Sequence, residues 1–214
     1  MSDYGTMAPE RLPDLESQFG QIDIYLFDQL LRGRLKPPMT VLDAGCGPGR
    51  NLVHFLRSGY DVLAADADGE SIAAVRRLAA RLAPDLPSTN FRVEPIEAMT
   101  FPDGCADAVL GSAVLHFSRD DRQFSAMLNG MWRVLKPGGL LFCRLASSIG
   151  MEDRVQPIAG RRCRLPDGTE RYLVDQAMLL DLTEQLGGRL IDPLKTTIVQ
   201  DQRCMTTWVL RKNR

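Results

Sequence analysis

A mixed α/β fold with a parallel sheet is the architecture that the sequence predicts. Short apolar runs alternate with amphipathic stretches from residue 41 to residue 145, and glycine or proline turns separate them. Strands that alternate with helices form a parallel sheet covered by helices on both faces. The segment VLDAGCGPGR, residues 41–50, stands between the first strand and its helix, where open α/β sheets bind ligands.

The expected elements of this alternation follow from apolar periodicity. An amphipathic helix begins near Ile22, after an N-terminal stretch without periodicity, and ends at Gly33 and Pro37-Pro38, because proline removes a donor and disfavours helix before it. The chain then alternates between strands, near 41–42, 61–66, 91–93, 108–111 and 140–145, and helices, near 51–58, 72–82 and 120–135.

The alternation stops after Ser147. Residues 166–169, PDGT, have the composition of a hairpin turn between 161–164 and 171–173, and a helix is expected over 175–186. Two β-rich runs follow at 194–199 and 205–210. About five residues separate these runs, too few for a parallel crossover, so the two strands must pair antiparallel.

Composition excludes several classes of protein. The 26 basic and 27 acidic residues nearly cancel, so the chain lacks the positive charge that nucleic-acid binding requires, and we expect no nucleic-acid partner. Five scattered cysteines without a CxxC pair predict neither disulfides nor a metal site. Because no apolar run reaches the roughly 20 residues of a membrane span and the N-terminus lacks an apolar signal core, we expect a cytoplasmic protein without membrane contact.

The glycine-rich segment predicts a ligand approached by bare main chain. Gly45, Gly47 and Gly49 permit a sharp turn and leave no Cβ in the way of a ligand. A dinucleotide-binding loop would have glycine or alanine at position 50, where it frees helix N–H groups for a pyrophosphate, but Arg50 stands there. An ordinary tight turn is the alternative, and Arg50 makes a nicotinamide-dependent oxidoreductase the weaker hypothesis.

Two carboxylates flank this turn at positions suited to a ligand. Asp43, just before the glycines, suits a cationic group of the ligand. Asp66 ends the second strand, where a carboxylate can accept hydrogen bonds from both ribose hydroxyls. Asp68 is the neighbour with which Asp66 can be confused, and a solvated loop acid is the alternative interpretation of Asp66.

The chain resembles the class I S-adenosylmethionine-dependent methyltransferases at these residues. VLDAGCGPGR is similar to their motif I, and Asp66 stands where their ribose-binding acid stands. Residues 101–109, FPDGCADAV, resemble the family's PFPDGSFDVV segment, and residues 132–139, WRVLKPGG, resemble its RVLKPGG. The resemblance covers about residues 38–147. It implies a Rossmann-like three-layer sandwich with a seven-stranded, mostly parallel sheet of order 3-2-1-4-5-7-6, the last strand antiparallel, and here an N-terminal helical extension.

We therefore expect a single domain over residues 1–214. Residues 1–37 form the extension and cap helix, residues 38–147 the cofactor-binding core, and residues 148–214 the insertion hairpin, a helix and the antiparallel pair. The resemblance also implies an enzyme that transfers methyl groups from its cofactor, S-adenosyl-L-methionine, to a small-molecule acceptor. The cofactor-binding residues that it implies are Asp43, Ala44, Gly45, Gly47, Arg50, Asp66, Ala67, Ile96, Glu97, Ser112 and Ala113.

One stretch departs from the family pattern. After the third strand the family often has an acid that contacts the adenine amino group, as in GDAE, but this chain has Glu94-Pro95-Ile96-Glu97, with proline at the usual aspartate position. We expect the Ile96 side chain and a backbone N–H to hold the adenine, with Glu97 as a substitute for the acid.

Methyl transfer from a sulfonium is an in-line displacement, so positioning and exclusion of water supply most of the catalysis and no dedicated catalytic residue is obligatory. His116, just past the fourth strand, is the candidate general base and substrate contact, and packing or capping of the next helix is its alternative role. Arg144 suits an anionic substrate group or a surface ion pair, and Tyr25 suits the cofactor cover or the core. The arginine run at 161, 162 and 164 suits a substrate lid, a partner surface or a solvated face.

A second class of function stays open alongside the enzyme. Pro95 and the lack of a plain catalytic group are compatible with a protein that binds S-adenosylmethionine or S-adenosylhomocysteine without catalysis, as a sensor or assembly subunit. A methyltransferase that modifies RNA or protein is less favoured, because the chain has neither a basic stripe nor an asparagine-proline-proline-aromatic motif.

Overall fold

A computed structural model describes residues 14–214, so most of the aperiodic N-terminal stretch lies outside the described residues. One sheet contains β1 (Thr40–Ala44), β2 (Asp61–Asp66), β3 (Phe91–Val93), β4 (Ala106–Ser112), β5 (Leu135–Ala146), β9 (Gly188–Leu190), β10 (Lys195–Val199) and β11 (Arg203–Lys212). The α-helices are α1 (Leu15–Phe19), α2 (Ile24–Leu31), α3 (Val53–Arg57), α4 (Gly69–Leu82), α5 (Asp121–Val134) and α6 (Gln176–Gln185). Short 3-10 turns are η1 (Ser88–Asn90), η2 (Ile96–Ala98) and η3 (Leu115–Phe117).

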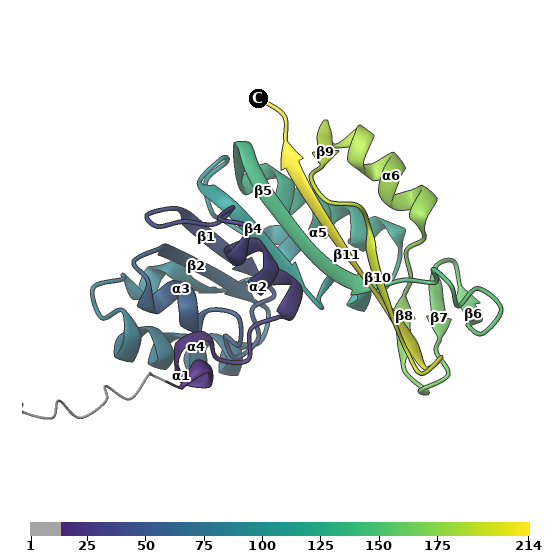
Figure 1. Ribbon diagram of the computed structural model, residues 1–214, viewed down its shortest axis with the longest axis horizontal. Helices are drawn as coiled ribbons and strands as arrows, with labels where there is room; N and C mark the ends of the chain where they lie inside the picture. Colours follow the sequence, from purple (N-terminus) through teal and green to yellow (C-terminus); the bar gives the residue numbers. More distant parts are fainter. Residues whose placement is uncertain (1–13) are drawn as a thin grey trace, which may run out of the picture.

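The strand order is β10-β11-β5-β4-β1-β2-β3, which is the predicted order 3-2-1-4-5-7-6 (Figure 1). β1 pairs in parallel with β2 and β4, β2 with β3, and β4 with β5, whereas β11 runs antiparallel to both β5 and β10. The predicted antiparallel pairing of the last two strands is therefore confirmed.

The strand count differs from the prediction. Within residues 14–214 the main sheet has eight strands, because β9 also pairs with β11. β9 and β10 lie along the same edge of β11, with Leu190 opposite Leu210 and Lys195 opposite Thr207. Pro193 lies between them and has no N–H to donate to a ladder, so the predicted sixth strand becomes one interrupted edge strand.

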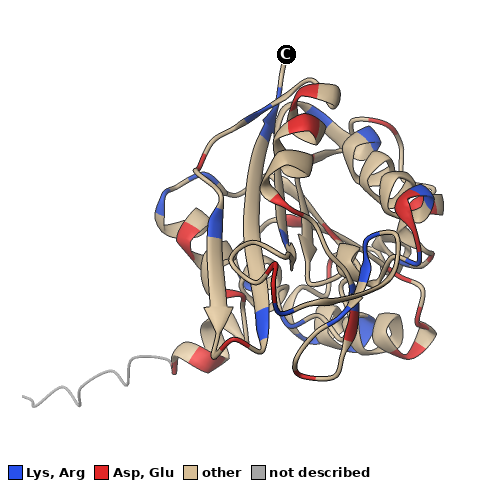
Figure 2. Cartoon of the chain, turned by 90° about the vertical axis from the view of Figure 1, so that its right-hand side faces the viewer, with Lys and Arg blue, Asp and Glu red and all other residues tan. Residues whose placement is uncertain are grey.

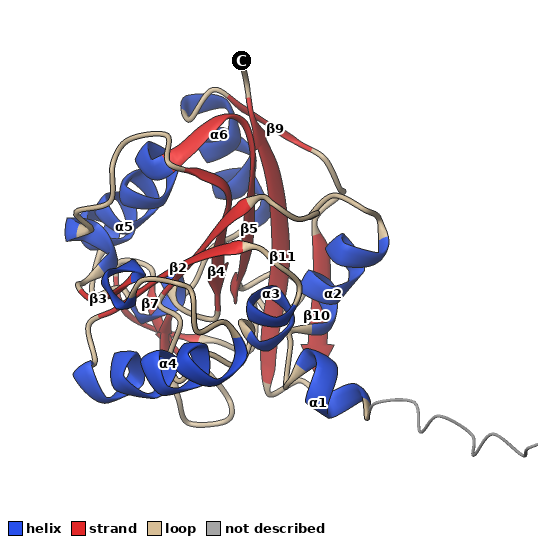
Figure 3. Cartoon of the chain, turned by 90° about the vertical axis from the view of Figure 1, so that its left-hand side faces the viewer, coloured by secondary structure: helices blue, strands red, loops and turns tan. Residues whose placement is uncertain are grey.

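Helices cover both faces of the sheet and form three layers (Figure 3). Neighbouring residues of β1 point to opposite faces, as strand geometry requires. Val41 joins a buried cluster with residues of α2, α3 and α4, and Leu42 joins a second cluster with residues of α5 and α6. Both faces of the parallel strands are thus buried, as their continuous apolar runs predicted.

Two helices of the described range precede the first strand, and the second of them packs its inner side into the core. The helix predicted from Ile22 is α2, and Asp23 caps its first turn by accepting a hydrogen bond from the Tyr25 N–H at 2.9 Å. α1, which the sequence did not predict, is five residues long and buries none of them. Leu26 is fully buried on the inner side of α2, while Ile24 and Leu31 stay about 70% exposed on its outer side.

The fifth strand begins earlier than predicted. α5 ends at Val134 and β5 starts at the next residue, Leu135, rather than at Leu140. The proline and two glycines that were expected to follow the helix as a loop lie inside the strand, where the pairing with β4 shifts register between Ala106 and Ala108. An irregular ladder of this kind accommodates proline without losing the strand.

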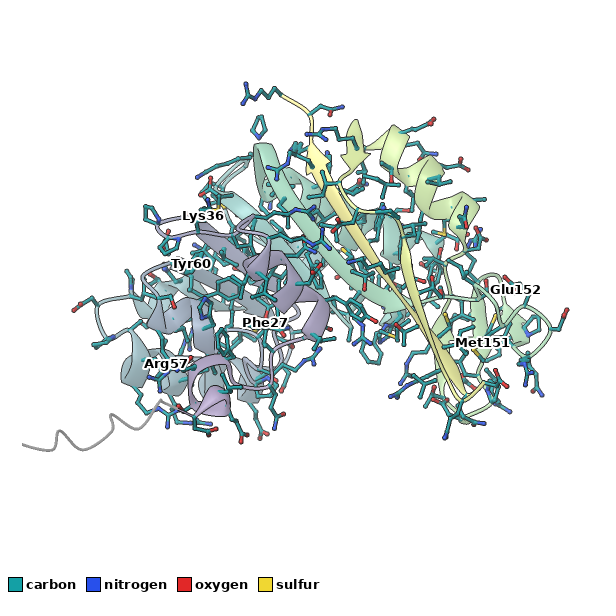
Figure 4. The ribbon with its side chains drawn as sticks, viewed as in Figure 1. Phe27, Lys36, Arg57, Tyr60, Met151 and Glu152 are labelled. Atoms are coloured by element: carbon teal, nitrogen blue, oxygen red, sulfur yellow. The ribbon has the colours of Figure 1, made fainter. Side chains whose placement is uncertain are left out.

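The predicted hairpin of the insertion is confirmed, and a third strand joins it. β7 (Arg162–Arg164) and β8 (Glu170–Tyr172) pair antiparallel, and β6 (Gln156–Ala159) pairs with β7. Met151 and Glu152, at the start of the insertion, lie at the opposite end of the molecule from Arg57 (Figure 4). The insertion stands beside the β10–β11 turn (Figure 1). None of the helices in the described range is both long and apolar enough to cross a membrane.

Close packing of α5 on η2 makes one glycine obligatory. A Cβ at Gly130 would lie 2.5 Å from the Ile96 carbonyl oxygen, which is backbone and cannot rotate away. We predict that Gly130→Ala lowers the free energy of unfolding by about 1–3 kcal/mol through overpacking. Gly69→Ala is the matched control in α4, where nothing lies within 4 Å, and should be neutral or stabilising by up to about 1 kcal/mol. Urea denaturation measures both, and similar losses in the two variants would contradict the prediction.

Candidate functional site

The glycine-rich loop ties the ends of β1 and β2 together. The N–H groups of Gly45 and Cys46 donate to the Ala65 carbonyl at 2.8 and 3.2 Å, and the Gly47 N–H donates to Asp66 Oδ2 at 2.8 Å. Gly45, Gly47 and Gly49 have φ of 76°, 52° and 88°, a region that side chains disfavour. The three glycines therefore make a backbone turn that other residues would strain.

The two sides of this loop differ in how open they are. A Cβ at Gly45 would collide with the Val114 side chain and would lie 3.2 Å from Ile96 Cδ1, so this glycine permits close packing. A Cβ at Gly47 would meet nothing within 4 Å. Bare main chain therefore faces open space at Gly47, which is where a ligand can approach the backbone.

Asp66 lies at the end of β2 with its carboxylate turned to the loop. Oδ2 accepts from Gly47 and Oδ1 accepts from the Asp68 N–H at 2.9 Å. A carboxylate has about four acceptor positions, so Asp66 keeps capacity for hydroxyl donors of a ligand. Asp68 instead caps α4 by accepting from the Glu70 and Ser71 N–H groups, so its carboxylate serves the helix.

Asp43 supplies a buried carboxylate oxygen that lacks a partner. The residue is 1% exposed, and among residues 14–214 nothing bonds its Oδ2. Burial raises the pKa of Asp43 to about 7, although the positive charge of Arg50 opposes the rise. An unpaired carboxylate oxygen beside an open glycine loop fits a ligand that brings a positive charge, as the ammonium group of S-adenosylmethionine would.

The remaining predicted cofactor residues surround this loop at the carboxyl ends of the strands. Ala44 is buried at the end of β1, Ala67 is exposed beside Asp66, and Ile96 is 4% exposed against Gly45. Glu97 is exposed and accepts a hydrogen bond from Gln123 Nε2 at 2.8 Å, so part of its acceptor capacity is committed to α5.

Asp23 is a site residue that the sequence did not predict. Its carboxylate is fully buried, and Oδ2 accepts from Ser112 Oγ and from Arg144 Nη1, both at 3.1 Å. Arg50 Nη2 lies 3.8 Å from the same oxygen and donates to Ser112 Oγ at 3.0 Å. The sequence signal for Asp23 was an acid at a helix start, which indicates a cap and gives no hint of this cluster of Asp23, Arg50, Ser112 and Arg144.

Two predicted substrate residues are engaged with this cluster. The Arg144 guanidinium lies 5.3 Å from the Tyr25 ring centroid, and Tyr25 bonds Thr197 of β10 through its hydroxyl at 2.6 Å. Tyr25 therefore fastens α2 to the edge of the sheet. Arg144 Nε is buried and has no hydrogen-bond partner in the described part of the chain.

A cavity of about 250 Å³ opens at the carboxyl ends of β4 and β5. The loop after β4, the hairpin of the insertion and the β10–β11 turn all contribute to its wall. The lining residues are Ala113, His116, Arg144, Ala146, Leu165, Asp167, Thr169, Arg171, Val199, Arg203 and Met205. Ala113 has φ of 63°, an uncommon conformation for a residue with a side chain, and its N–H donates to the Arg144 carbonyl at 2.7 Å.

His116 lines this cavity as a neutral ring. Its Nδ1 accepts a hydrogen bond from the Ala146 N–H at 3.2 Å, so in the neutral imidazole the ring proton is on Nε2. Burial, with smaller contributions from Arg171 and Arg144, lowers the pKa of His116 to about 4. The ring therefore presents a donor, whereas the general base that the sequence suggested would need a free lone pair.

The arginines at 161, 162 and 164 of the insertion all form ion pairs. Arg161 bonds Asp175 at 2.8 Å, while Arg162 and Arg164 bond Glu170 at 3.3 and 2.8 Å. Basic and acidic segments are interspersed on the side of the molecule shown in Figure 2. These three arginines do not line the cavity, and the arginine that β8 directs there is Arg171.

Known proteins resemble this chain, most clearly over its glycine loop and the strands and helices that follow. Residues 41–139 match the model of the methyltransferase domain family. An uncharacterized methyltransferase of Synechocystis is 30% identical over 50% of this chain and 46% of that protein. A Mycobacterium tuberculosis protein named "Probable S-adenosylmethionine-dependent methyltransferase" is 29% identical over 87% of this chain and 71% of that protein. The match to the Synechocystis protein thus spans about half the length of each chain.

The fold agrees with these matches. The structure of a Burkholderia thailandensis 1,6-didemethyltoxoflavin-N1-methyltransferase, with bound 1,6-didemethyltoxoflavin and S-adenosylhomocysteine, superposes with a TM-score of 0.65 at 20% identity, over 86% of this chain and 76% of that chain. The sheet order and the glycine loop agree with the methyltransferase domain that residues 41–139 match. Residues 41–139 thus form a methyltransferase domain, and the chain is similar in sequence to S-adenosylmethionine-dependent methyltransferases.

The buried cluster around Asp23 leads to a prediction about stability. Asp23→Asn removes the negative charge that faces Arg144 and Arg50 and should lower the free energy of unfolding by about 3 kcal/mol, because it leaves a buried pair broken. Asp28→Asn on the same helix is the control. Asp28 is partly exposed beside Arg32 and Lys195, so its loss should stay below about 1 kcal/mol. Equal losses in urea denaturation would show that the Asp23 cluster contributes no more than a surface pair.

The raised pKa of Asp43 leads to a prediction about pH. Because burial raises the pKa from 3.8 to about 7, the folded state holds a proton that the unfolded state releases, and Asp43 makes stability fall as pH rises from about 4 to about 7. At about 1.36 kcal/mol per pKa unit, the effect is on the order of 4 kcal/mol. Asp43→Asn should therefore gain stability over the natural chain across this range, with a constant difference above pH 7. Parallel profiles from urea denaturation at pH 4.5–8 would refute this.

Proposed function

We propose that this protein transfers the methyl group of S-adenosylmethionine to a small-molecule acceptor held in the cavity at the ends of β4 and β5. The supporting observation is the position of this cavity. It is lined by Ala113, directly after β4, and by Arg144 of β5, and β4 is the sheet neighbour of β1, the strand that leads into the glycine loop. Its volume of about 250 Å³ suits a metabolite, being below the roughly 300–1,000 Å³ of sites for drug-sized ligands.

Two further observations favour a small acceptor. The chain has nearly balanced charge, with 26 basic and 27 acidic residues, which disfavours a nucleic-acid acceptor. The Burkholderia structure shows that the same fold holds a small acceptor together with the demethylated cofactor.

The residues of this chain contribute mainly position and a dry environment. The cofactor, when bound, supplies a methyl group on a sulfonium sulfur that leaves as a neutral thioether. The main chain at Gly47 would contact the cofactor directly. The carboxylate of Asp43 would bind its ammonium group, and the carboxylate of Asp66 would bind its ribose hydroxyls. Fixing two reactants in attack geometry supplies about 7–11 kcal/mol of a barrier, so positioning alone accounts for a large part of the catalysis.

His116 acts in this proposal as a hydrogen-bond donor. The Ala146 N–H occupies Nδ1, and Nε2 carries the ring proton. Its pKa of about 4 keeps the ring uncharged at neutral pH. His116 therefore orients the acceptor by donating from Nε2, and the proton that an acceptor loses goes to another group or to water.

Incubation of the protein with radiolabelled S-adenosylmethionine and fractionated metabolite extracts tests the proposed function. Transfer of label to a small-molecule fraction is the expected result, with Asp66→Ala as the control that should lose transfer. Tight binding of S-adenosylhomocysteine without transfer to any fraction would instead support the non-catalytic binding protein.

The role of Asp66 is tested by binding alone. Asp66→Ala removes the acceptor for ribose hydroxyls, and since a hydrogen bond to a charged group contributes about 1.5–3 kcal/mol, S-adenosylhomocysteine should bind at least about tenfold more weakly. Asp68→Ala is the matched control, because it removes a neighbouring carboxylate that caps α4 and should leave the affinity near that of the natural chain. Isothermal titration calorimetry measures both, and an unchanged dissociation constant for Asp66→Ala would overturn its assigned role.

A further inference from the structure

The wall of the acceptor cavity comes mostly from segments outside the matched methyltransferase domain. That domain covers residues 41–139 and contributes Ala113 and His116, whereas the other lining residues lie beyond residue 139. The insertion with β8 and the turn before β11 lie side by side at this end of the sheet (Figure 1). The chemistry of these segments therefore sets what the cavity accepts.

Hydrogen-bond donors dominate this wall. Among the lining residues, His116 carries its ring proton on Nε2, and Arg171 of β8 and Arg203 of β11 each carry a guanidinium group. Arg171 donates one bond, from Nη1 to the Glu170 carbonyl at 2.7 Å, and lies 4.9 Å from the Phe117 ring centroid, which leaves its other N–H groups available. Arg203 is exposed and has no ion-pair partner within 4.0 Å among the described residues.

Asp167 is the single carboxylate among the lining residues that the structure describes, and one of its oxygens already accepts hydrogen bonds. Asp167 Oδ1 accepts from the Thr169 N–H at 2.9 Å and from Thr169 Oγ1 at 2.6 Å. Hydrogen bonds from Thr169, and then the charges of Arg203 and Arg171, lower the pKa of Asp167. Asp167 therefore stays charged at neutral pH and offsets one of the two arginines.

The charge of the cavity selects the charge of its ligand. The buried carboxylate of Asp23 binds Arg144 at 3.1 Å, and Arg50, which lies 3.8 Å from the same carboxylate, does not line the cavity. Arg171 and Arg203 then face Asp167 alone, and His116 is neutral. Among the charged groups that line the cavity, with Asp23 counted against Arg144, one positive charge is left over, which a monoanion neutralises and a phosphate dianion would exceed.

We propose that the acceptor is a small monocarboxylate, whose carboxylate is bound by Arg171 and Arg203 while His116 donates a further hydrogen bond from Nε2. Guanidinium groups bind carboxylates through paired, charge-assisted hydrogen bonds, which gives both affinity and orientation. This inference rests on the proposed function, because it assigns the acceptor of that same cavity. It also moves the anion-binding role from Arg144, which Asp23 holds, to Arg171 and Arg203.

Equilibrium binding with matched probes tests the proposal without turnover. Protein saturated with S-adenosylhomocysteine is titrated with three acids and their neutral amides: benzoate and benzamide, 4-hydroxybenzoate and 4-hydroxybenzamide, hexanoate and hexanamide. Ligand-observed NMR gives the dissociation constants. In at least one pair the acid should bind about tenfold more tightly than its amide, because charge-assisted hydrogen bonds are lost in the amide.

The variants Arg203→Gln and Arg171→Gln should each reduce that preference severalfold. Arg203 is exposed at the start of β11, so its replacement leaves the core intact even if Arg171→Gln disturbs the insertion. Arg189→Gln is the control. It makes the same charge change on β9, where Arg189 lies opposite Arg211 in the strand ladder, near the other end of β11. This variant should keep the preference.

Each outcome decides the proposal. Acids that bind no better than their amides, an equal loss in Arg189→Gln, or tighter binding of phenyl phosphate than of benzoate would overturn the monocarboxylate. Titration of S-adenosylhomocysteine into the same samples separates the two proposals. If that ligand does not bind, the proposed function fails, whereas normal cofactor-product binding without a preference for acids overturns only the inference about the acceptor.

Discussion

The hydrogen bond from the Gly47 N–H to the Asp66 carboxylate is the contact on which the cofactor half of the site depends. It joins a turn that only glycines adopt without strain to the end of the neighbouring parallel strand. The bonds from Gly45 and Cys46 to the Ala65 carbonyl hold the same two strand ends together. A loop fixed in this way keeps its main chain open at Gly47 before any ligand arrives, so little ordering has to accompany binding.

A second fixed point lies on the other side of the loop. The carboxylate of Asp23 links the first turn of α2 to Ser112 at the end of β4 and to Arg144 of β5. Because Tyr25 also bonds Thr197 of β10, the helix is held at both the centre and the edge of the sheet. In the proposed site, the helix that starts after Asp23 therefore takes part, since Asp23 neutralises Arg144 of the cavity wall.

The two halves of the site differ in where they come from. Residues that would hold the cofactor belong to the alternating strands and helices, and their positions follow from the ends of parallel strands meeting at one edge. Most residues of the cavity wall come from the insertion and from the β10–β11 turn. A common core for the cofactor and separate segments for the acceptor explain how one fold serves different substrates.

The amino-acid sequence by itself determined the order of strands and helices, the antiparallel final pair, the glycine turn and the position of Asp66, because each depends on local periodicity and short spacing. The sequence did not predict the break of the edge strand at Pro193 or the early start of β5, because pairing with neighbouring strands decides where a strand continues. Tertiary structure alone decided the partners of Asp23, which lie 89 and 121 residues away along the chain, and the tautomer of His116, which the Ala146 N–H sets from 30 residues away. Such contacts form only when distant segments meet, and the periodicity of a sequence carries no information about which polar atoms will then face each other.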